Sequence, residues 1–410
     1  MPSTYHMSPG VRVEEIPSGA RSIEAVGTST AAFVGVAPRA DAHLNEAYAV
    51  NNWSQFVKDY VPAENAVSTA LSHAVAGFFQ NGGSRCYVVN IATGDAIAGV
   101  DKPKRTGLKL LEEIDDVSIV AAPGYSDVAS HEALQTHAEN KGDCFVILDP
   151  PATVADVDLL KAVEAAPVPA KGGKKDSGGD GGDTPPAGLR PRVSKDGRAA
   201  LYYPNLLIAD PLSAKGDLVQ VSPSGFIAGV YARTDKERGV HKAPANVSLR
   251  GVLNLTYRVT DAEQADLNSA GINIIRFFRR DGVLVWGART LAEESSEWRY
   301  LNVRRLTIML EASILRATTW AVFEPNDVGL WKALRFEIAS FLTRVWRDGA
   351  LRGATPEEAF FVKCDAETNP PEVVDAGQVV AVIGFAPSKP AEFVILRIGQ
   401  HAGGGSAEII

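Results

Sequence analysis

The residue types that most often carry chemistry are present in this 410-residue chain, but they are scattered. The two nearest of its seven histidines, His131 and His137, are six positions apart, and that spacing does not place two metal ligands on one helix face. The cysteines, Cys86, Cys144 and Cys364, lie far apart in apolar stretches, so we expect buried free thiols and not disulfides. The sequence therefore predicts no metal site and no cofactor.

Other sequence patterns that could mark an active site are incomplete. The adjacent acids Glu112 and Glu113 are typical of a solvated face, because sequence neighbours rarely face one another as an acid–base pair. Residues 124–128 begin like a nucleophile elbow but end in valine where that turn needs glycine. The glycine-rich stretch 170–188 lacks the Gly-x-x-x-x-Gly-Lys-Ser/Thr pattern of a phosphate-binding loop, so we interpret it as a flexible insertion. We therefore predict that the chain is not an enzyme.

The composition, net charge and length of the chain restrict the class of protein to which it can belong. A net charge of -8 argues against bulk nucleic-acid binding, and a hydrophobic fraction of 45% is typical of a globular protein with a sizeable core. The length favours two or three domains. The N-terminus has no basic and apolar signal-peptide pattern, and no run of about 18 apolar residues indicates a membrane span. We expect a protein that is assembled in the cytoplasm.

The elements that would position a site form an α/β pattern in the first half of the chain. Apolar strand-like runs at 31–37, 85–91, 117–121, 144–148 and 199–208 alternate with helical segments. This alternation predicts a largely parallel sheet.

The second half has a different character. Two apolar runs between 272 and 286 flank Asp281-Gly282 and predict a hairpin, since this pair tolerates the positive φ of tight turns. Helices are expected over 298–318 and from the N-cap-like pair Asn326-Asp327 to 348. Opposite its apolar face, the second helix carries a basic face made of Lys332, Arg335, Arg344 and Arg347, interrupted by Glu337 and Asp348. That face is either an ordinary solvated surface or a docking site for an acidic protein.

The N-terminal residues pose a separate question. Val11, Val13 and Ile16 form a short extended segment among prolines and glycines. A lone terminal strand cannot bury its own face, so it must pair with its own domain or with another chain.

Read together, several long segments resemble the contractile tail sheath family of phage tails and extracellular contractile injection systems. The resemblance is carried by residues 8–35, 78–91, 229–246, 271–278, 285–291, 297–306, 320–327, 341–365, 369–377 and 390–398. It covers almost the whole chain and is weakest over 95–210.

The resemblance implies a mixed α/β and α+β fold: a core domain built from the N- and C-terminal regions, with a mixed sheet and flanking helices, and an inserted outer α/β domain. The expected segments are an N-terminal arm (1–27), the first half of the core domain (28–92), the outer domain (93–246), the second half of the core domain (247–388) and a C-terminal strand and arm (389–410).

The resemblance also implies a structural role. Sheath subunits stack as sixfold rings around an inner tube, meet baseplate and cap proteins at the ends, and contract to drive the tube through a target membrane without inserting themselves. Their arms complete the sheets of neighbouring subunits, which here implicates Val11, Val13, Ile16, Phe393, Val394, Ile395, Leu396 and Ile398. The family's tube contact is a basic helix, which corresponds to Lys332, Arg335, Arg344 and Arg347. Such particles can leave the producing cell by lysis.

Two alternatives remain open from the sequence. The region 95–240 could be an α/β enzyme domain that binds a small molecule. The chain could also be a cap or baseplate relative of the sheath, which would form closed rings and not polymerise.

Overall fold

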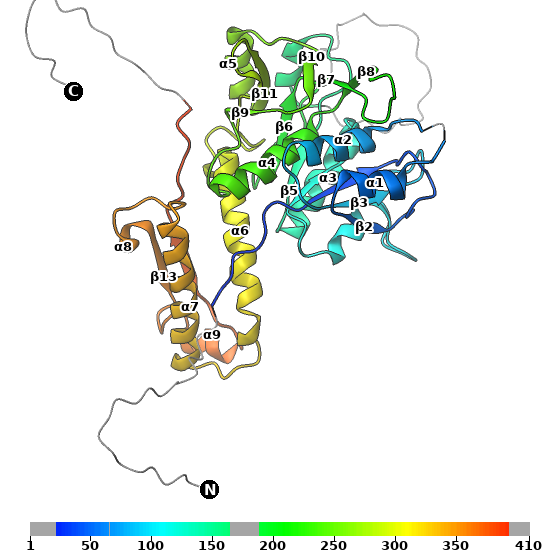
Figure 1. Ribbon diagram of the computed structural model, residues 1–410. Coiled ribbons are helices and arrows are strands. Elements are labelled where there is room, and N and C mark those ends of the chain that lie inside the picture. Colours follow the sequence, from blue (N-terminus) through cyan, green and yellow to red (C-terminus); the bar gives the residue numbers. More distant parts are fainter. Residues whose placement is uncertain (1–21, 65, 165–187, 393–410) are drawn as a thin grey trace, which may run out of the picture. The chain divides into compact units, whose positions relative to one another are not determined.

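The computed structural model confirms a mixed α/β fold and is shown in Figure 1. It describes residues 22–64, 66–164 and 188–392. The chain divides into two compact units. The larger unit contains Gly27–Met309 and the chain from Pro387 onward, and the smaller unit contains the chain up to Val26 and Leu310–Ala386. The chain therefore crosses between the units three times.

The larger unit is built on a mixed sheet in which nine strands of the described chain follow the order β2-β3-β1-β4-β5-β6-β11-β12-β9. The strands are β1 (Ala31–Gly35), β2 (Ala47–Val50), β3 (Cys86–Asn90), β4 (Ile119–Ala121), β5 (Phe145–Leu148), β6 (Ala199–Tyr203), β9 (Val247–Ser248), β11 (Ile272–Phe278) and β12 (Gly282–Val285). The run from β3 to β11 is parallel, while β2, β12 and β9 are antiparallel at the edges.

Helical segments cover both faces of this sheet. The helices α1 (Trp53–Tyr60), α2 (Ala70–Gln80) and α4 (Ser224–Arg238) pack on one face. The other face carries α3 (Val128–Lys141), α5 (Asp261–Ser269), η1 (Gly107–Glu113) and η2 (Val157–Lys161). Because both faces are covered, β1 is buried along its whole length, with Phe33 and Val34 in opposite cores.

The crossing of α2 and α4 depends on glycine. A Cβ on Gly77 would lie 2.4 Å from the Phe226 ring, and one on Gly225 would lie 2.3 Å from the Ala74 backbone. The two helices can approach this closely because neither glycine carries a side chain.

Two smaller features complete the larger unit. A three-stranded antiparallel sheet has the order β10-β7-β8, with β7 (Leu206–Ala209), β8 (Leu218–Val221) and β10 (Val252–Leu255). The predicted hairpin is confirmed as β11–β12, with Gly282 at φ 76° directly after the turn, as the first residue of β12. Between β5 and β6 the described chain forms only the short 3₁₀ segment η2, and Val163 bridges to Arg190.

The smaller unit is helical with one short sheet. After η3 (Glu297–Arg299), α6 (Leu301–Ala317) carries the chain into it, and there follow η4 (Thr319–Ala321), α7 (Val328–Arg347), α8 (Pro356–Ala359), β13 (Phe360–Lys363), α9 (Pro371–Asp375) and β14 (Val382–Phe385). The Asp327 carboxylate caps α7 by accepting from the Leu330 amide, as its sequence predicts. Figure 1 shows α7 beside β13, and Leu330, Trp331, Leu334 and Cys364 form the local core.

The domain boundaries expected from the family resemblance differ from the division into two compact units. One sheet runs through the segments expected to be separate at 28–92, 93–246 and 247–388, because β1 pairs with β3 on one side and β4 on the other. The boundary between compact units falls after Met309, within α6. Alternating strands and helices do not state strand order, so the sequence could not place these boundaries. Within the described residues, no helix has the length and apolar character needed to cross a bilayer.

Candidate assembly surface

The smaller unit presents a two-stranded sheet with open edges. Phe361 is opposite Gly384 in the antiparallel β13–β14 pair, and the Ala386 amide donates to the Ala359 carbonyl at 2.8 Å. Because hydrogen-bonded pairs alternate along such a ladder, Val362 and Ile383 direct their backbone groups outward, one on each edge. No third strand pairs with either edge in the region of the chain that is described. Unpaired edges are templates for strands from other chains.

Large apolar side chains are also more exposed in this unit. Phe323 is fully exposed, and Phe336 and Phe361 are 62% and 57% exposed. Of the seventeen large apolar side chains exposed among the described residues, eight belong to this much smaller unit: Leu315, Val322, Phe323, Val328, Phe336, Phe361, Val380 and Val382. Apolar exposure of this density marks a surface that meets another protein.

A groove of about 610 Å³ lies between α7 and the β13 region. It is lined by Lys332, Arg335, Phe336, Ala339, Pro356, Glu357, Phe360, Phe361 and Val362. The lining thus combines apolar side chains with the cations Lys332 and Arg335 and the acid Glu357.

The basic face of α7 is more continuous than the sequence suggests. Lys332, Arg335 and Arg347 are exposed and form no salt bridge with any residue that the structure describes. Glu337, which was expected to interrupt the face, is 5% exposed and accepts a hydrogen bond from the Trp320 indole at 3.1 Å. Burial of this carboxylate removes one of the two expected interruptions, and the other, Asp348, is exposed at the end of the helix.

Arg344 has a different role from its neighbours on α7. Its guanidinium donates to the Ser22 hydroxyl at 3.0 Å and to the Ile23 carbonyl. The Val26 amide then donates to the Ser313 hydroxyl at 3.0 Å. These contacts hold the chain directly after residues 1–21 against the smaller unit.

The enzyme alternative requires accessible reacting groups, and the larger unit does gather polar side chains near the ends of β4 and β5. The Asp149 carboxylate accepts from the Ser224 amide and hydroxyl at 2.9 and 2.7 Å. His131 contacts the Asp149 carbonyl at 3.0 Å through Nε2. These three residues are at most 2% exposed, so substrate cannot reach them. They are structural: they fix the loop after β5 to the first turn of α4.

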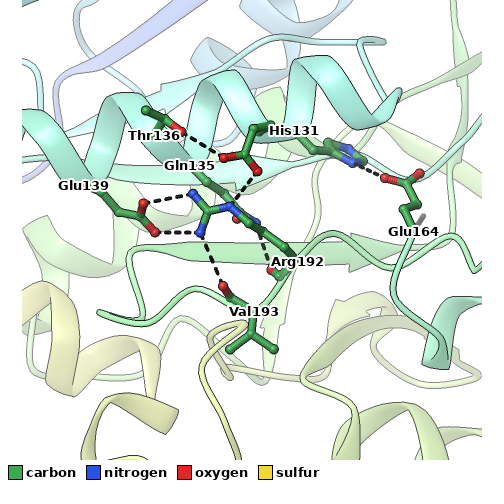
Figure 2. A network of polar contacts seen from close by, with 8 residues as sticks. His131, Gln135, Thr136, Glu139, Glu164, Arg192 and Val193 are labelled. Carbon is green, nitrogen blue, oxygen red and sulfur yellow. Dashed lines mark hydrogen bonds and ion pairs between the residues drawn. The ribbon is translucent and has the colours of Figure 1, made fainter. Parts of the chain in front are cut away.

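Figure 2 shows how this region is tied to α3. His131 lies 3.3 Å from the Glu164 carboxylate, and Arg192 makes paired contacts with Glu139 at 2.9 and 2.8 Å. Arg192 also donates to Glu132 at 2.6 Å. The network therefore holds the chain on both sides of residues 165–187.

The stability of the Asp149→Asn variant relative to wild type is expected to rise from acid to neutral pH. Burial, opposed by hydrogen bonds from Ser224, raises the pKa of Asp149 to about 6. The folded protein binds the proton of the Asp149 carboxyl group more tightly than the unfolded chain does. Protonation therefore stabilises the folded wild type fully below about pH 4, and this contribution is lost as pH rises through 6. At about 1.4 kcal/mol per pKa unit, the free energy of unfolding of the variant should rise relative to that of wild type by up to about 3 kcal/mol between pH 4 and 7.

Urea unfolding at several pH values measures this difference. Asp281→Asn, an exposed change of the same charge, is the control and should show no such trend. A constant difference between Asp149→Asn and wild type from pH 4 to 7 would contradict the buried-carboxylate interpretation.

Comparison with known proteins identifies the family. Models of the phage tail sheath protein central domain and of the phage tail sheath C-terminal domain match residues 192–291 and 293–400. The sheath complex of an extracellular contractile injection system, PVC, in the contracted state has a TM-score of 0.73 at 31% identity, covering 97% of this chain and 99% of that one. This chain belongs to the contractile tail sheath family.

Further relatives agree with this assignment. The contracted helical sheath of the anti-feeding prophage (AFP) has a TM-score of 0.72 at 31% identity, over 97% of this chain and 100% of that one. The tail sheath protein of Vibrio phage KVP40 is 30% identical over 191 residues, which are 46% of this chain and 28% of the phage protein. The chain thus spans little more than a quarter of that phage relative's length, whereas it spans the injection-system sheaths almost completely.

Within the sheath family, the sequence-derived site residues divide into two groups. Val11, Val13, Ile16 and residues 393–398 lie outside the described residues. Lys332, Arg335, Arg344 and Arg347 all lie on α7, but Arg344 is engaged with Ser22 and Ile23. Sequence reasoning expected a strand over 378–385, which contains β14, but it missed β13 and the pairing of the two strands, although the apolar run Phe360-Phe361-Val362 could have indicated a strand.

Proposed function

We propose that the chain is a structural, non-enzymatic sheath subunit that polymerises as stacked sixfold rings around an inner tube. Contraction of this sheath drives the tube through a target membrane, and no nucleotide is needed because the energy is stored at assembly. The observation that carries the proposal is the β13–β14 sheet, open along both edges, in a chain that resembles contracted sheaths along nearly its full length.

Strand exchange would connect the subunits. Two terminal segments, around Val11–Ile16 and Phe393–Ile398, are the proposed donors, and two sheet edges are the proposed acceptors. A donated strand opposite a four-residue edge makes about four backbone hydrogen bonds, each worth roughly 1 kcal/mol. Such bonds do not depend on side-chain identity, so the mesh stays connected while subunits rotate past one another.

The inner tube is the proposed partner of the basic face. Lys332, Arg335 and Arg347 are exposed cations without an ion pair in the described chain, which suits an acidic tube surface. Exposed ion pairs are worth at most about 1 kcal/mol each, so such contacts break readily when the sheath moves away from the tube. Arg344 contributes less to this contact because it already holds residues 22–23.

Negative-stain microscopy of the chain expressed with its tube protein tests the proposal. We expect long striated sheaths around a tube. With Lys332→Glu and Arg335→Glu together, we expect sheaths that lose the tube on sedimentation at physiological salt. The matched control, Arg279→Glu with Arg280→Glu in the exposed hairpin turn, should retain it. Failure of the wild-type chain to polymerise under any condition would refute the proposal.

A second candidate has one specific observation behind it. The AFP baseplate structure matches with a TM-score of 0.71 at 31% identity, over 97% of this chain and 100% of that one. A baseplate-associated relative would form closed rings next to baseplate or cap proteins and would not extend into a sheath. The same micrographs separate the two roles. In both, assembly takes place in the producing cell and the particle can be released by lysis.

A further inference from the structure

A buried arginine holds the chain just before residues 393–410. Glu392 is the last described residue, and its carboxylate meets Arg289 in a paired contact: Nε to Oε1 at 3.0 Å and a terminal nitrogen to Oε2 at 2.7 Å. The Arg289 side chain is 4% exposed and that of Glu392 is 17% exposed. Paired arginine–carboxylate contacts shielded from water are among the strongest polar contacts in proteins.

Arg289 is in turn fixed to the central sheet. Its remaining terminal nitrogen donates to the Asn268 carbonyl at 2.9 Å. The buried Asn273 side chain on β11 accepts from the Arg289 amide and donates to the Arg289 carbonyl, both at 2.7 Å. Asn273 also donates to the Leu201 carbonyl on β6 at 3.2 Å. A continuous set of hydrogen bonds thus runs from Glu392 to two parallel strands.

A second contact holds the same stretch of chain a few residues earlier. The Asn302 amide on α6 donates to the Ser388 carbonyl at 3.0 Å and to the His241 carbonyl at 2.7 Å. Residues 387–392 are therefore held at both ends within the larger unit, although they form no helix or strand.

We propose that the Arg289–Glu392 pair is an anchor that fixes the origin of the C-terminal segment, so that a strand donated by residues 393–398 transmits force to the central sheet. This inference rests on the proposed strand exchange. Without the anchor, the four residues after Ser388 could extend over up to about 14 Å and add slack between neighbouring subunits. With it, displacement of one subunit moves its neighbour directly. Arg289 and Glu392 are positioning residues, and the exchanged strand itself makes the contact.

The test uses the full chain and two matched variants. Glu392→Gln removes the charge that pairs with Arg289 but keeps the side-chain size. Glu294→Gln makes the same change at a carboxylate that lies 3.8 Å from Arg289, outside hydrogen-bond distance, and is 58% exposed. Hydrogen–deuterium exchange of residues 388–392 is the readout, because local release is measurable even where global stability is unchanged.

We expect exchange in residues 388–392 to be at least about tenfold faster in Glu392→Gln than in wild type, since a buried charge-assisted contact is lost. Glu294→Gln should match wild type. Equal exchange in all three proteins would overturn the anchor. A uniform rise over the whole larger unit would also overturn it, because the pair would then be a general stabiliser and not a local fastening.

Microscopy of assembled material separates this inference from the proposed function. If wild type forms sheaths, Glu392→Gln should give sheaths with irregular striation or fewer intact sheaths after contraction, while Glu294→Gln should resemble wild type. Regular, fully contractile Glu392→Gln sheaths would overturn the force-transmitting role even if local exchange were faster. If wild type forms no sheaths, the proposed function fails, and the exchange experiment still decides whether the anchor exists.

Discussion

Deletion of residues 1–20 is expected to yield a folded subunit that forms no sheath. The contacts of Arg344 with Ser22 and Ile23, and of Ser313 with Val26, all lie outside the deletion, so the unfolding midpoint should stay close to that of wild type. What is lost is a donated strand worth roughly 4 kcal/mol per subunit contact, repeated throughout the lattice. Thermal unfolding by circular dichroism and negative-stain microscopy measure the two effects separately.

A second variant distinguishes strand pairing from a simple need for chain length. Replacing Val11, Val13 and Ile16 by serine keeps the length and the backbone donors but removes the apolar side chains. We expect this variant to assemble weakly and the deletion not at all. Regular, contractile sheaths from the deletion variant would show that these residues are not needed for the mesh.

Proline on the open edge of β14 is expected to abolish assembly through one missing hydrogen-bond donor. Ile383 directs its backbone N–H away from β13, so Ile383→Pro leaves the β13–β14 pairing largely intact while it removes the outward donor and obstructs an incoming strand. Ile383→Ala is the matched control, because it loses side-chain contacts but keeps the N–H. We expect few or no sheaths from the proline variant and near-normal numbers from the alanine variant.

The other edge of the same sheet allows the parallel experiment. Val362→Pro and Val362→Ala change the outward-facing position on β13 in the same way. If both donated segments use this sheet, proline at either edge should prevent normal sheaths. Assembly that tolerates proline at both positions would place strand exchange elsewhere in the subunit.

The contacts of Arg344 and Arg289 and the edges of the β13–β14 sheet would together keep the proposed sheath lattice connected. Arg344 holds the origin of the N-terminal segment on the smaller unit, and Arg289 holds the origin of the C-terminal segment on the larger unit. The proposed acceptor edges lie on the smaller unit. Each subunit would then be tethered at short, fixed points, which limits how far neighbours separate during contraction.

Local signals in the sequence were sufficient to predict the helices and strands that are stabilised by their own residues. The Asp281-Gly282 turn predicted the β11–β12 hairpin, and the Asp327 cap with helical apolar spacing predicted α7. Buried apolar runs predicted the strands of a mostly parallel sheet. The family itself was identifiable because long stretches along the chain keep the sheath pattern.

Strand order, burial and contacts between residues far apart in the chain could be read only from the tertiary structure. Only the folded chain places β1 between β3 and β4, which merges the expected domains into one sheet. Only packing buries Glu337 and engages Arg344 with Ile23, which changes the expected basic face. The β13–β14 pairing joins two separate segments, and the Arg289–Glu392 contact joins residues 103 positions apart. Propensity and periodicity report on neighbours along the chain, whereas strand order, burial and long-range pairing are fixed by the packing of the whole unit.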